Sequence, residues 1–468
     1  MSRYIQILDK NQSRRSFLKT TAALSVAQSA APLALSLAGM GEAAALTAPA
    51  GDYKALVCVF LYGGNDYANT LIPYDQTSYN AYQSFRSNLA ISRIFLDPTV
   101  LNPATPLPNA HQYALAPEMA ALIPRFNSGA LSVLLNIGSL VQPITKAQYS
   151  KGGVPLPPKL FSHNDQQSYW QSSSPEGASS GWGGRMGDLF EASNSSGSAF
   201  TCIGLNGNSV YLSGQTAFPY QLTTTGAVPF NAVNSSLFGS SSAAAALKTL
   251  INTPRTHLLE NEYLKVSQRS LTAYASVSQA FSKSALTTSF PLANSLGDQL
   301  QAVAKLIAAR TSLNVKRQVF FVSLGGFDNH TLLAKVHPGL MQTVGDAMSA
   351  FYQATVDLGV ANQVTAFTAS DFGRTLLSNS DGSDHGWGSV HFMLGGAVKG
   401  QSFVGTPPVL GNNGPDDVGQ GRLLPQLSVD QLAATLGNWF GVSAQDQLTV
   451  LPNLKNYTQR DLGNLSVS

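Results

Sequence analysis

The stretch Ala55-Leu56-Val57-Cys58-Val59-Phe60-Leu61-Tyr62-Gly63-Gly64-Asn65-Asp66 decides the fold class of this chain. A short, unbroken apolar run that ends at a glycine pair is typical of a strand buried on both faces of a sheet. The glycines let the backbone turn sharply beyond the strand. The stretch therefore predicts a parallel-sheet strand over Ala55–Leu61, with Asp66 beyond its carboxyl end.

Five further apolar runs repeat this pattern, and helical patterns lie between several of them. The runs are Leu131–Ile137, Phe200–Leu205, Val319–Leu324, Val364–Thr368 and His391–Val398. The helical patterns are Glu118–Phe126, Trp182–Ala192, Leu340–Leu358 and Val429–Phe440. Strands that alternate with helices predict an α/β fold with a mostly parallel central sheet and helices on both faces.

Two segments interrupt this alternation within a domain predicted over residues 52–465. Residues 206–250 are rich in Ser, Thr, Gly and Asn and are interpreted as a polar insertion. Residues 253–310 have a helical pattern with a break near Ser289–Pro291. We interpret this second segment as a helical hairpin that forms a cap or a layer against the sheet.

Residues 1–45 have the pattern of a twin-arginine export signal. Arg14-Arg15-Ser16-Phe17-Leu18-Lys19 precedes a weakly apolar stretch, and Ala43-x-Ala45 fits a cleavage site. We therefore expect a folded protein that is exported to the periplasm or secreted. No later segment approaches about eighteen uninterrupted apolar residues, so we expect no stable membrane insertion after cleavage.

Charge and cysteine content narrow the possible partners. Residues 1–45 hold five of the 28 basic and two of the 25 acidic residues, so the remainder holds 23 of each. A neutral chain without a basic stripe argues against nucleic acid as a partner. Cys58 and Cys202 both lie in apolar runs and are interpreted as buried free thiols, with a disulfide between them as the alternative.

Carboxylate and imidazole side chains cluster after several predicted strands. These residues are Asp66, Asp328, His330, Asp371, Asp384, His385 and His391. The carboxyl ends of parallel strands meet at one edge of a sheet, where α/β proteins bind their ligands. Although each cluster alone could be a turn, a cap or a surface pair, together they predict a site for one or two zinc, manganese or calcium ions.

The segment Phe161-Ser162-His163-Asn164-Asp165 follows the second predicted strand and holds a hydroxyl, an imidazole and a carboxylate. Neighbours in sequence rarely point at one another, so the segment is a poor Ser-His-Asp triad. We predict instead that it places a nucleophile, Ser162, or a metal ligand, His163, over the site. Arg374 offers a planar fork of donors for an anionic group, with a structural ion pair as the alternative.

Seven segments in a fixed order resemble a known family. They are Leu61–Asp66, Ser162-His163, Gly181–Arg185, Gly325–His330, Asp371–Thr375, Asp384–Gly388 and Leu394–Gly400. As a set they are similar to the bacterial domain-of-unknown-function family 1501, whose members are often exported by the twin-arginine route. That family looks like a branch of the alkaline phosphatase and sulfatase superfamily, which implies an alkaline-phosphatase-like fold.

The same resemblance implies an ordered set of site residues. Asp66 fits the aspartate after the first strand, Ser162 the nucleophile, and Asp328 with His330 the next pair. For the Asp-His pair that follows, Asp371 is succeeded by Phe372 where a histidine is expected. The alternative is that Asp384 and His385 form this pair and His391 is the last ligand.

Two functions are compatible with these residues. The first is a metal-dependent hydrolase of phosphate or sulfate esters, in which the metal activates Ser162 or a water and Arg374 steadies the anion. The second is a non-catalytic exported protein that keeps the fold and binds a glycan, a surface polymer or a co-encoded exported protein. Phe372 in a ligand position and the insertion at 206–250 favour this alternative.

Overall fold

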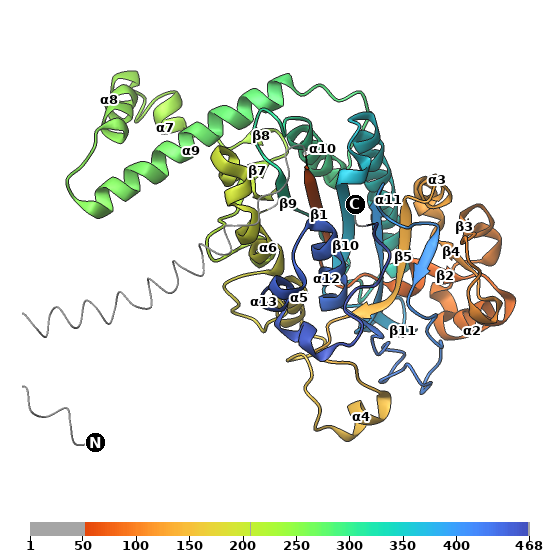
Figure 1. Cartoon of the computed structure of the whole chain (residues 1–468). Coiled ribbons are helices and arrows are strands. Elements are labelled where there is room, and N and C mark those ends of the chain that lie inside the picture. Colours follow the sequence, from red (N-terminus) through yellow and green to blue (C-terminus); the bar gives the residue numbers. More distant parts are fainter. Residues whose placement is uncertain (1–51, 206, 467–468) are drawn as a thin grey trace, which may run out of the picture. The chain divides into compact units, whose positions relative to one another are not determined.

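A ten-stranded sheet organises the computed structural model, which describes residues 52–205 and 207–466 (Figure 1). The predicted export signal over residues 1–45 lies outside the described residues. In spatial order, the strands are β14 (Ser402–Val404), β5 (Leu131–Gly138), β13 (Ser389–Gly395), β10 (Val364–Ser370), β1 (Lys54–Leu61), β9 (Arg317–Leu324), β6 (Cys202–Gly204), β7 (Tyr220–Thr223) and β8 (Gly226–Ala227). Strand β15 (Leu427–Ser428) pairs with β5.

The sheet is mostly parallel, as predicted. Strands β10, β1, β9 and β6 run in one direction, and all six predicted runs lie in this sheet. Strand β13 differs because it is antiparallel to both β10 and β5. Its first residue, Ser389, therefore lies at the edge where β1, β9 and β10 end, which brings the segment before β13 to that edge.

Strand β1 is the central strand and is buried along its whole length. It pairs with β9 on one side and β10 on the other, with Cys58 opposite Phe321 and Phe367. Strand β9 separates β1 from β6, so Cys58 and Cys202 are not adjacent, and both are buried free thiols. An all-apolar strand fits this position because each large apolar side chain stabilises the fold by about 1.5–3 kcal/mol when fully buried.

Helices cover both faces of the sheet, as predicted (Figure 1). On one face α10 (Ser295–Ala308) and α11 (Leu333–Asp357) join the main apolar core together with Val57 and Val59. On the other face lie α5 (His163–Ser172), α6 (Trp182–Phe190) and α12 (Val429–Phe440). There Trp182 stacks on Phe367 of β10.

Two predicted helices have different bounds because of proline. The predicted helix over Glu118–Phe126 is a 3₁₀ helix over Pro117–Leu122 followed by α3 (Ile123–Asn127). Pro124 lacks the N–H that a continuous α-helix would need there. Helix α11 begins seven residues before the predicted Leu340, with Pro338 inside it and Leu333 buried at its start.

The remaining elements surround the sheet. The helices are α2 (Gln76–Arg86), α4 (Lys146–Lys151), α7 (Asn231–Asn234), α8 (Ser241–Asn252), α9 (Leu258–Lys283) and α13 (Ala444–Val450). The strands are β2 (Leu71–Pro73), β3 (Val100–Leu101), β4 (Tyr113–Leu115), β11 (Arg374–Ser378) and β12 (Ser383–His385). Within residues 52–205 and 207–466, no helix is both long and apolar enough to cross a membrane.

Candidate metal centre

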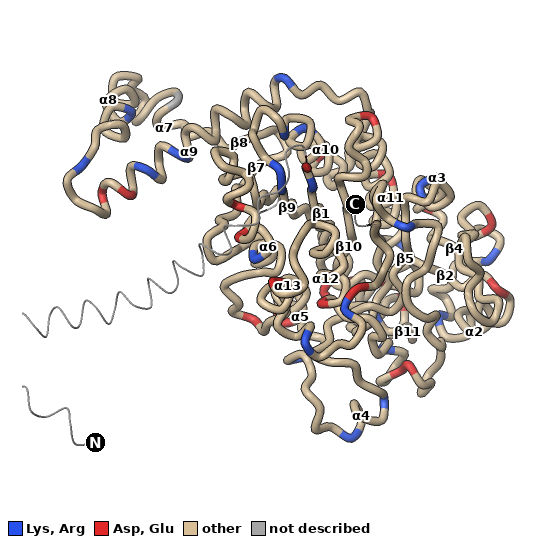
Figure 2. Tube along the Cα trace, in the orientation of Figure 1, with Lys and Arg blue, Asp and Glu red and all other residues tan. Residues whose placement is uncertain are grey.

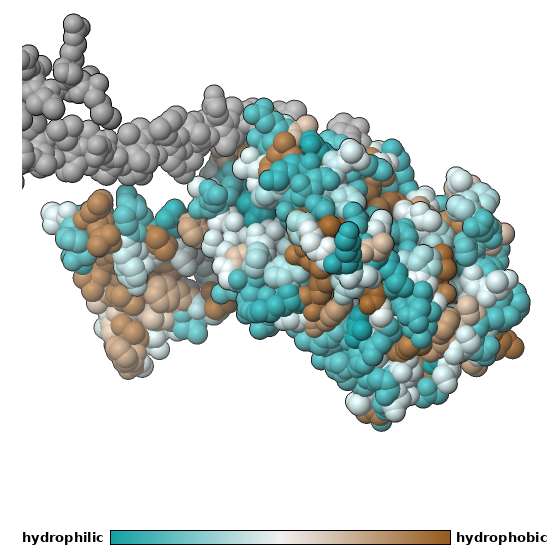
Figure 3. Space-filling view, turned by 90° about the horizontal axis from the view of Figure 1, so that it is seen from below, coloured by the Kyte–Doolittle hydropathy of each residue, from teal (hydrophilic) through white to brown (hydrophobic). Residues whose placement is uncertain are grey.

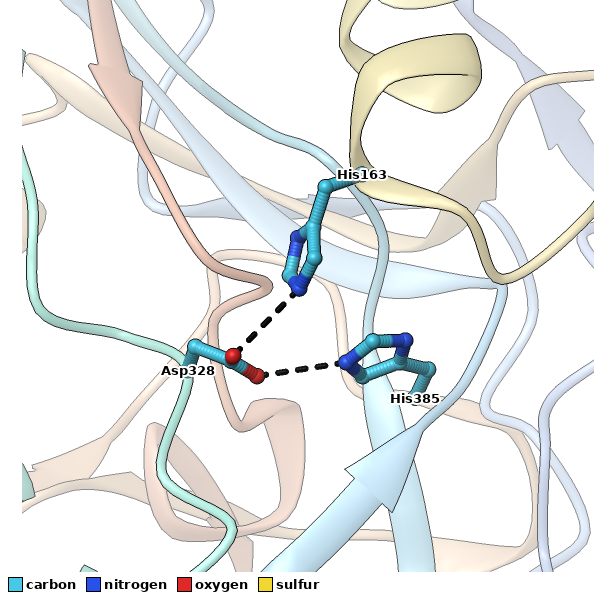
Figure 4. Close-up of side chains that lie close together, drawn as sticks. All are labelled: His163, Asp328 and His385. Atoms are coloured by element: carbon cyan, nitrogen blue, oxygen red, sulfur yellow. Dashed lines mark hydrogen bonds and ion pairs between the residues drawn. The ribbon is translucent and has the colours of Figure 1, made fainter.

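Three chain segments bring histidines to the carboxyl edge of the sheet. The segment after β9 carries Asp328 and His330, and the β11–β12 hairpin carries Asp384 and His385. His163 is the first residue of α5. Figure 4 shows His163 and His385 pointing at Asp328 from different elements. Asp328 and His330 lie just beyond the end of β9, while strand β12 and the start of α5 bring His385 and His163 to the same place.

The Nε2 atoms of three imidazoles lie around the carboxylate of Asp328. Oδ2 is 3.4 Å from Nε2 of His163, and Oδ1 is 3.2 Å from Nε2 of His385. Nε2 of His330 is 3.1 Å from Oδ1 and only 2.9 Å from Nε2 of His385. Asp328 is 45% exposed and His330 42%, so the cluster is open on one side.

The opposite nitrogen of each imidazole is held by an acceptor. Nδ1 of His163 is 2.7 Å from Asp371, and Nδ1 of His330 is 3.3 Å from Asp384. Nδ1 of His385 is 2.6 Å from the carbonyl oxygen of Phe161. Carboxylate and carbonyl oxygens only accept, so each Nδ1 donates to its partner, and each Nε2 is left facing Asp328, where a proton or a cation can bind.

This arrangement fits a divalent metal ion. One donor atom from each of His163, Asp328 and His385 lies within 4.8 Å of the others. Ligands about 2.0–2.1 Å from a tetrahedral zinc ion are roughly 3.3 Å apart, close to the separations from Asp328 to the two rings. The Nε2 atoms of His330 and His385 are 2.9 Å apart, so a proton or a cation must lie between them. Nδ1 partners of this kind are what hold ligating histidines in place.

Arg374 contacts the carboxylate at the centre of the cluster. Its buried Nη1 donates to Oδ1 of Asp328 at 2.6 Å and to the carbonyl of Gly63 at 3.2 Å, while its remaining contacts are to Ser383. Partial burial raises the pKa of Asp328, but the hydrogen bond and charge of Arg374 outweigh this effect and bring the pKa below its ordinary value. The carboxylate of Asp328 is thereby kept ionised.

The pKa values of the surrounding groups shift for separate reasons. The hydrogen bond to Asp371 raises the pKa of His163 above its ordinary value, against the effect of burial. Burial lowers the pKa of His385. For Asp384, burial raises the pKa, but the hydrogen bonds from Asn379 and His330 lower it by more, so the pKa of this carboxyl is below its ordinary value.

Phe372, which stands where a histidine was expected, packs against the cluster. Its ring centroid is 5.0 Å from that of His163 and 4.6 Å from that of His385. Gly64 leaves room for it, since a Cβ there would lie 2.5 Å from the Phe372 ring. The phenyl ring is therefore an apolar wall that fixes two of the three imidazoles.

Other predicted site residues lie away from Asp328. Asp371 is fully buried behind His163, where it also accepts from Gln167 and from the amide of Gly63. His391 is buried within β13, with Nδ1 3.1 Å from the hydroxyl of Thr368, and burial lowers its pKa to about 3. The structure thus places Asp371 behind His163, Asp384 behind His330 and His391 inside the sheet.

Asp66 belongs to a separate buried cluster. It forms an ion pair with Arg86 of α2, and its Oδ1 has no hydrogen-bond partner among the described residues. His337 of α11 lies nearby, with Nε2 3.1 Å from Oδ1 of Asn65. Burial lowers the pKa of His337 to about 4. Arg86 therefore neutralises the charge of Asp66, the residue predicted as the first metal ligand, inside the protein.

Ser162 lies next to the cluster but faces another group. Its hydroxyl donates to Asp165 at 2.9 Å, one turn into α5. The predicted nucleophile therefore contacts a carboxylate that itself is near Lys159, at 3.6 Å.

Two contributors to the site were not predicted from the sequence. The carbonyl of Phe161 is a backbone group, which no residue pattern marks. Gln167 could have been found, because it lies four residues after His163 and so one helical turn away on the same face of α5.

The protein is therefore an α/β protein in which histidines and carboxylates gather at the carboxyl edge of the central sheet. The chain belongs to the family described as Protein of unknown function (DUF1501), whose family model matches residues 53–453. No curated protein shows significant similarity to it.

Two solved structures are similar to the chain at low identity. The lipoteichoic acid synthase LtaP from Listeria monocytogenes is 10% identical, with 89% of this chain and 81% of LtaP covered and a TM-score of 0.33. Ps i-CgsB in complex with k-i-k-neocarrahexaose is 9% identical, with 86% and 77% covered and a TM-score of 0.34. Because both scores are below 0.5, this similarity assigns no function to the chain.

Proposed function

We propose that this protein is a divalent-metal-dependent hydrolase of phosphate or sulfate esters, of the alkaline phosphatase and sulfatase type. One observation carries the proposal: three imidazole Nε2 atoms surround the carboxylate of Asp328 while an acceptor holds each Nδ1. A set of imidazoles oriented at Nδ1 around an ionised carboxylate is a metal-ligand set. Zinc or manganese suits it better than calcium, which prefers oxygen ligands.

In this proposal His163, His385 and Asp328 hold the ion, with His330 beside them. The bound ion would supply a Lewis acid for an ester oxygen and lower the pKa of a water. Arg374 keeps Asp328 ionised, and Asp371 keeps the proton of His163 on Nδ1. The exposed side of Asp328 and His330 leaves room for an anionic ester.

We favour a water over Ser162 as the nucleophile. The Ser162 hydroxyl donates to Asp165, whereas the open side of the cluster faces solvent. His330 is the most exposed of the three histidines and is placed to accept or return a proton at Nε2.

Metal analysis combined with ester turnover tests this function. Protein folded in the cytoplasm is expected to contain stoichiometric zinc or manganese and to hydrolyse an aryl phosphate or an aryl sulfate. Asp328→Asn and His163→Gln should each lose metal and turnover. The matched control is His257→Gln, which changes an exposed histidine far from the cluster in sequence. Metal-free protein that takes up no zinc or manganese and turns over no ester would exclude the proposal.

A second function is favoured by Phe372. A phenyl ring packed beside two imidazoles offers no ligand atom, which suits a protein that keeps a metal or glycan site without turnover. Under this alternative, the exported protein binds a glycan, a surface polymer or a co-encoded exported protein. Metal-loaded protein that binds a glycan panel but hydrolyses no ester would support it.

Export to the periplasm by the twin-arginine route completes the proposal. Metal loading before export would explain why a folded protein is carried. Arg14→Lys with Arg15→Lys should keep the protein in the cytoplasm, as measured by cell fractionation. Unchanged export would count against the twin-arginine route but not against the metal centre.

A further inference from the structure

Helices α7, α8 and the first half of α9 form a feature that we call the arm, residues 231–272. Helix α8 packs on α7 and α9, while the buried residues Ala273, Val277 and Ala280 lie in the second half of α9. That second half contacts β8 and α10. In Figure 1 the arm extends away from the sheet. Its surface is therefore available to a partner.

The arm exposes an apolar stripe along α9. Leu259, Tyr263 and Val266 are 72%, 70% and 53% exposed. Their spacing of four and three residues places them on one face of the helix. Leu259 and Tyr263 also line a groove of about 590 Å³ together with Arg255, Glu260 and Leu264. Figure 3 shows apolar residues gathered over the arm.

Such a stripe is unusual on a surface helix, whose exposed face is ordinarily polar. Large apolar patches on soluble proteins mark interaction sites. The charges beside the stripe indicate which partner fits. Glu262 and Arg269 lie seven residues apart, and so two turns apart, on the same flank of the stripe.

This spacing makes the stripe complementary to itself. If two copies of α9 pair antiparallel about a twofold axis between Lys265 and Val266, Glu262 of each copy lies opposite Arg269 of the other. Tyr263 and Val266 of both copies then meet near the centre. A twofold interface repeats each contact, so two ion pairs form along the same flank of one apolar layer.

We propose that the arm is a dimerisation surface for a second copy of this chain. An anionic membrane is the competing occupant, since Lys248, Arg255, Lys265 and Arg269 also lie on the arm. Figure 2 shows charges of both signs along it. Glu260 and Glu262 beside the stripe would repel anionic lipid but pair with cations of a second copy, and this difference favours the dimer.

Sedimentation velocity on the full chain from about 1 to about 100 µM tests the proposal, since an interface of two helices is small and should dissociate in this range. The wild type should show a concentration-dependent monomer–dimer equilibrium. Tyr263→Lys should abolish the dimer. Glu262→Arg and Arg269→Glu should each raise the dissociation constant at least about tenfold.

The double variant with Glu262→Arg and Arg269→Glu should return the dissociation constant to within about threefold of the wild-type value, because it exchanges the two charges across the axis. Lys265→Ala is the matched control, since it removes the intrahelical partner of Glu262 without changing the stripe. Circular dichroism should show each variant folded. The readout does not depend on the proposed hydrolase activity.

Three results would overturn the proposal. They are a monomer at all concentrations, a dimer unaffected by Tyr263→Lys in folded protein, and a double charge exchange that is no better than either single variant. A monomer that cosediments with vesicles of anionic phospholipid, and loses this property in Tyr263→Lys, would assign the stripe to a membrane instead.

Discussion

The cluster around Asp328 and the cluster around Asp66 are built from the same residue types and both lie beyond strands of the sheet. Each contains an aspartate in contact with an arginine and a histidine nearby. Asp328 is 45% exposed and has three imidazoles around it, whereas Asp66 is 1% exposed and is neutralised by Arg86. Residue type alone therefore does not distinguish the two clusters; the exposure of the aspartate and the partners of each ring nitrogen do.

The comparison predicts effects of very different size on stability when each aspartate is replaced. Asp66→Ala leaves the charge of Arg86 buried and unpaired, so it should lower the free energy of unfolding by about 3–5 kcal/mol. Asp328→Asn removes a half-exposed group and should change the stability of metal-free protein far less. Urea denaturation measures both.

The control for the first variant is Asp97→Ala, which removes an exposed carboxylate that accepts from Tyr74. We expect a change within about 0.5 kcal/mol for this control. Asp66→Ala protein as stable as the wild type would mean that the two clusters do not differ in the way proposed.

The cluster around Asp66 also predicts that the protein loses stability at acid pH. The pKa of His337 is lowered from 6.5 to about 4, so the unfolded chain binds a proton there that the folded chain does not. Stability should therefore fall as the pH falls from 6.5 to about 4, by about 3 kcal/mol from this group. Denaturation at several pH values measures this loss.

His337→Gln should remove most of that pH dependence while leaving an amide that can still donate to Asn65. Stability above pH 6.5 provides the baseline for each protein. An equally steep acid loss in His337→Gln would assign the effect to another buried group, such as His391, whose pKa is also lowered.

For the cluster around Asp328, we expect loss of the supporting carboxylate of Asp371 to lower metal affinity less than loss of a proposed ligand. Asp371→Asn keeps the size of the side chain but loses the charge that holds the Nδ1 proton of His163. Loss of such a partner ordinarily costs about 10–100-fold in metal affinity. Isothermal titration with zinc measures it, and His163→Gln, which removes the ligand itself, should cost more. Equal affinity in Asp371→Asn and wild type would contradict the role given to Asp371.

The sequence was sufficient for the sheet but only in part for the site. The apolar runs around Cys58 and Phe321 identify strands because burial on both faces requires them to be apolar throughout. Asp328, His330, Asp384 and His385 lie together at one edge, whereas Asp66 lies in a separate buried cluster and His391 inside the sheet, because the direction of each side chain depends on its packing. Asp66 and Asp328 look alike in sequence because each follows a glycine pair, and only the packing of α2 brings Arg86 onto Asp66.

The smallest expected effect concerns Ser162. Its hydroxyl donates to Asp165 rather than to the Asp328 cluster, so Ser162→Ala removes one partly buried hydrogen bond. We expect a loss of about 1 kcal/mol in stability and less than about threefold in ester turnover. Turnover by metal-loaded protein measures the second effect, with Ser180→Ala as a control for loss of a hydroxyl that accepts from Arg185.

A fall of about a thousandfold or more in the ester turnover of Ser162→Ala would identify the hydroxyl as the nucleophile. Removal of this hydroxyl stops a reaction in which it attacks the ester, but leaves a reaction in which a water attacks. It would also mean that Ser162 leaves Asp165 when substrate binds. The comparison of the two clusters would then not account for the reaction, because the attacking residue, Ser162, would lie in neither of them.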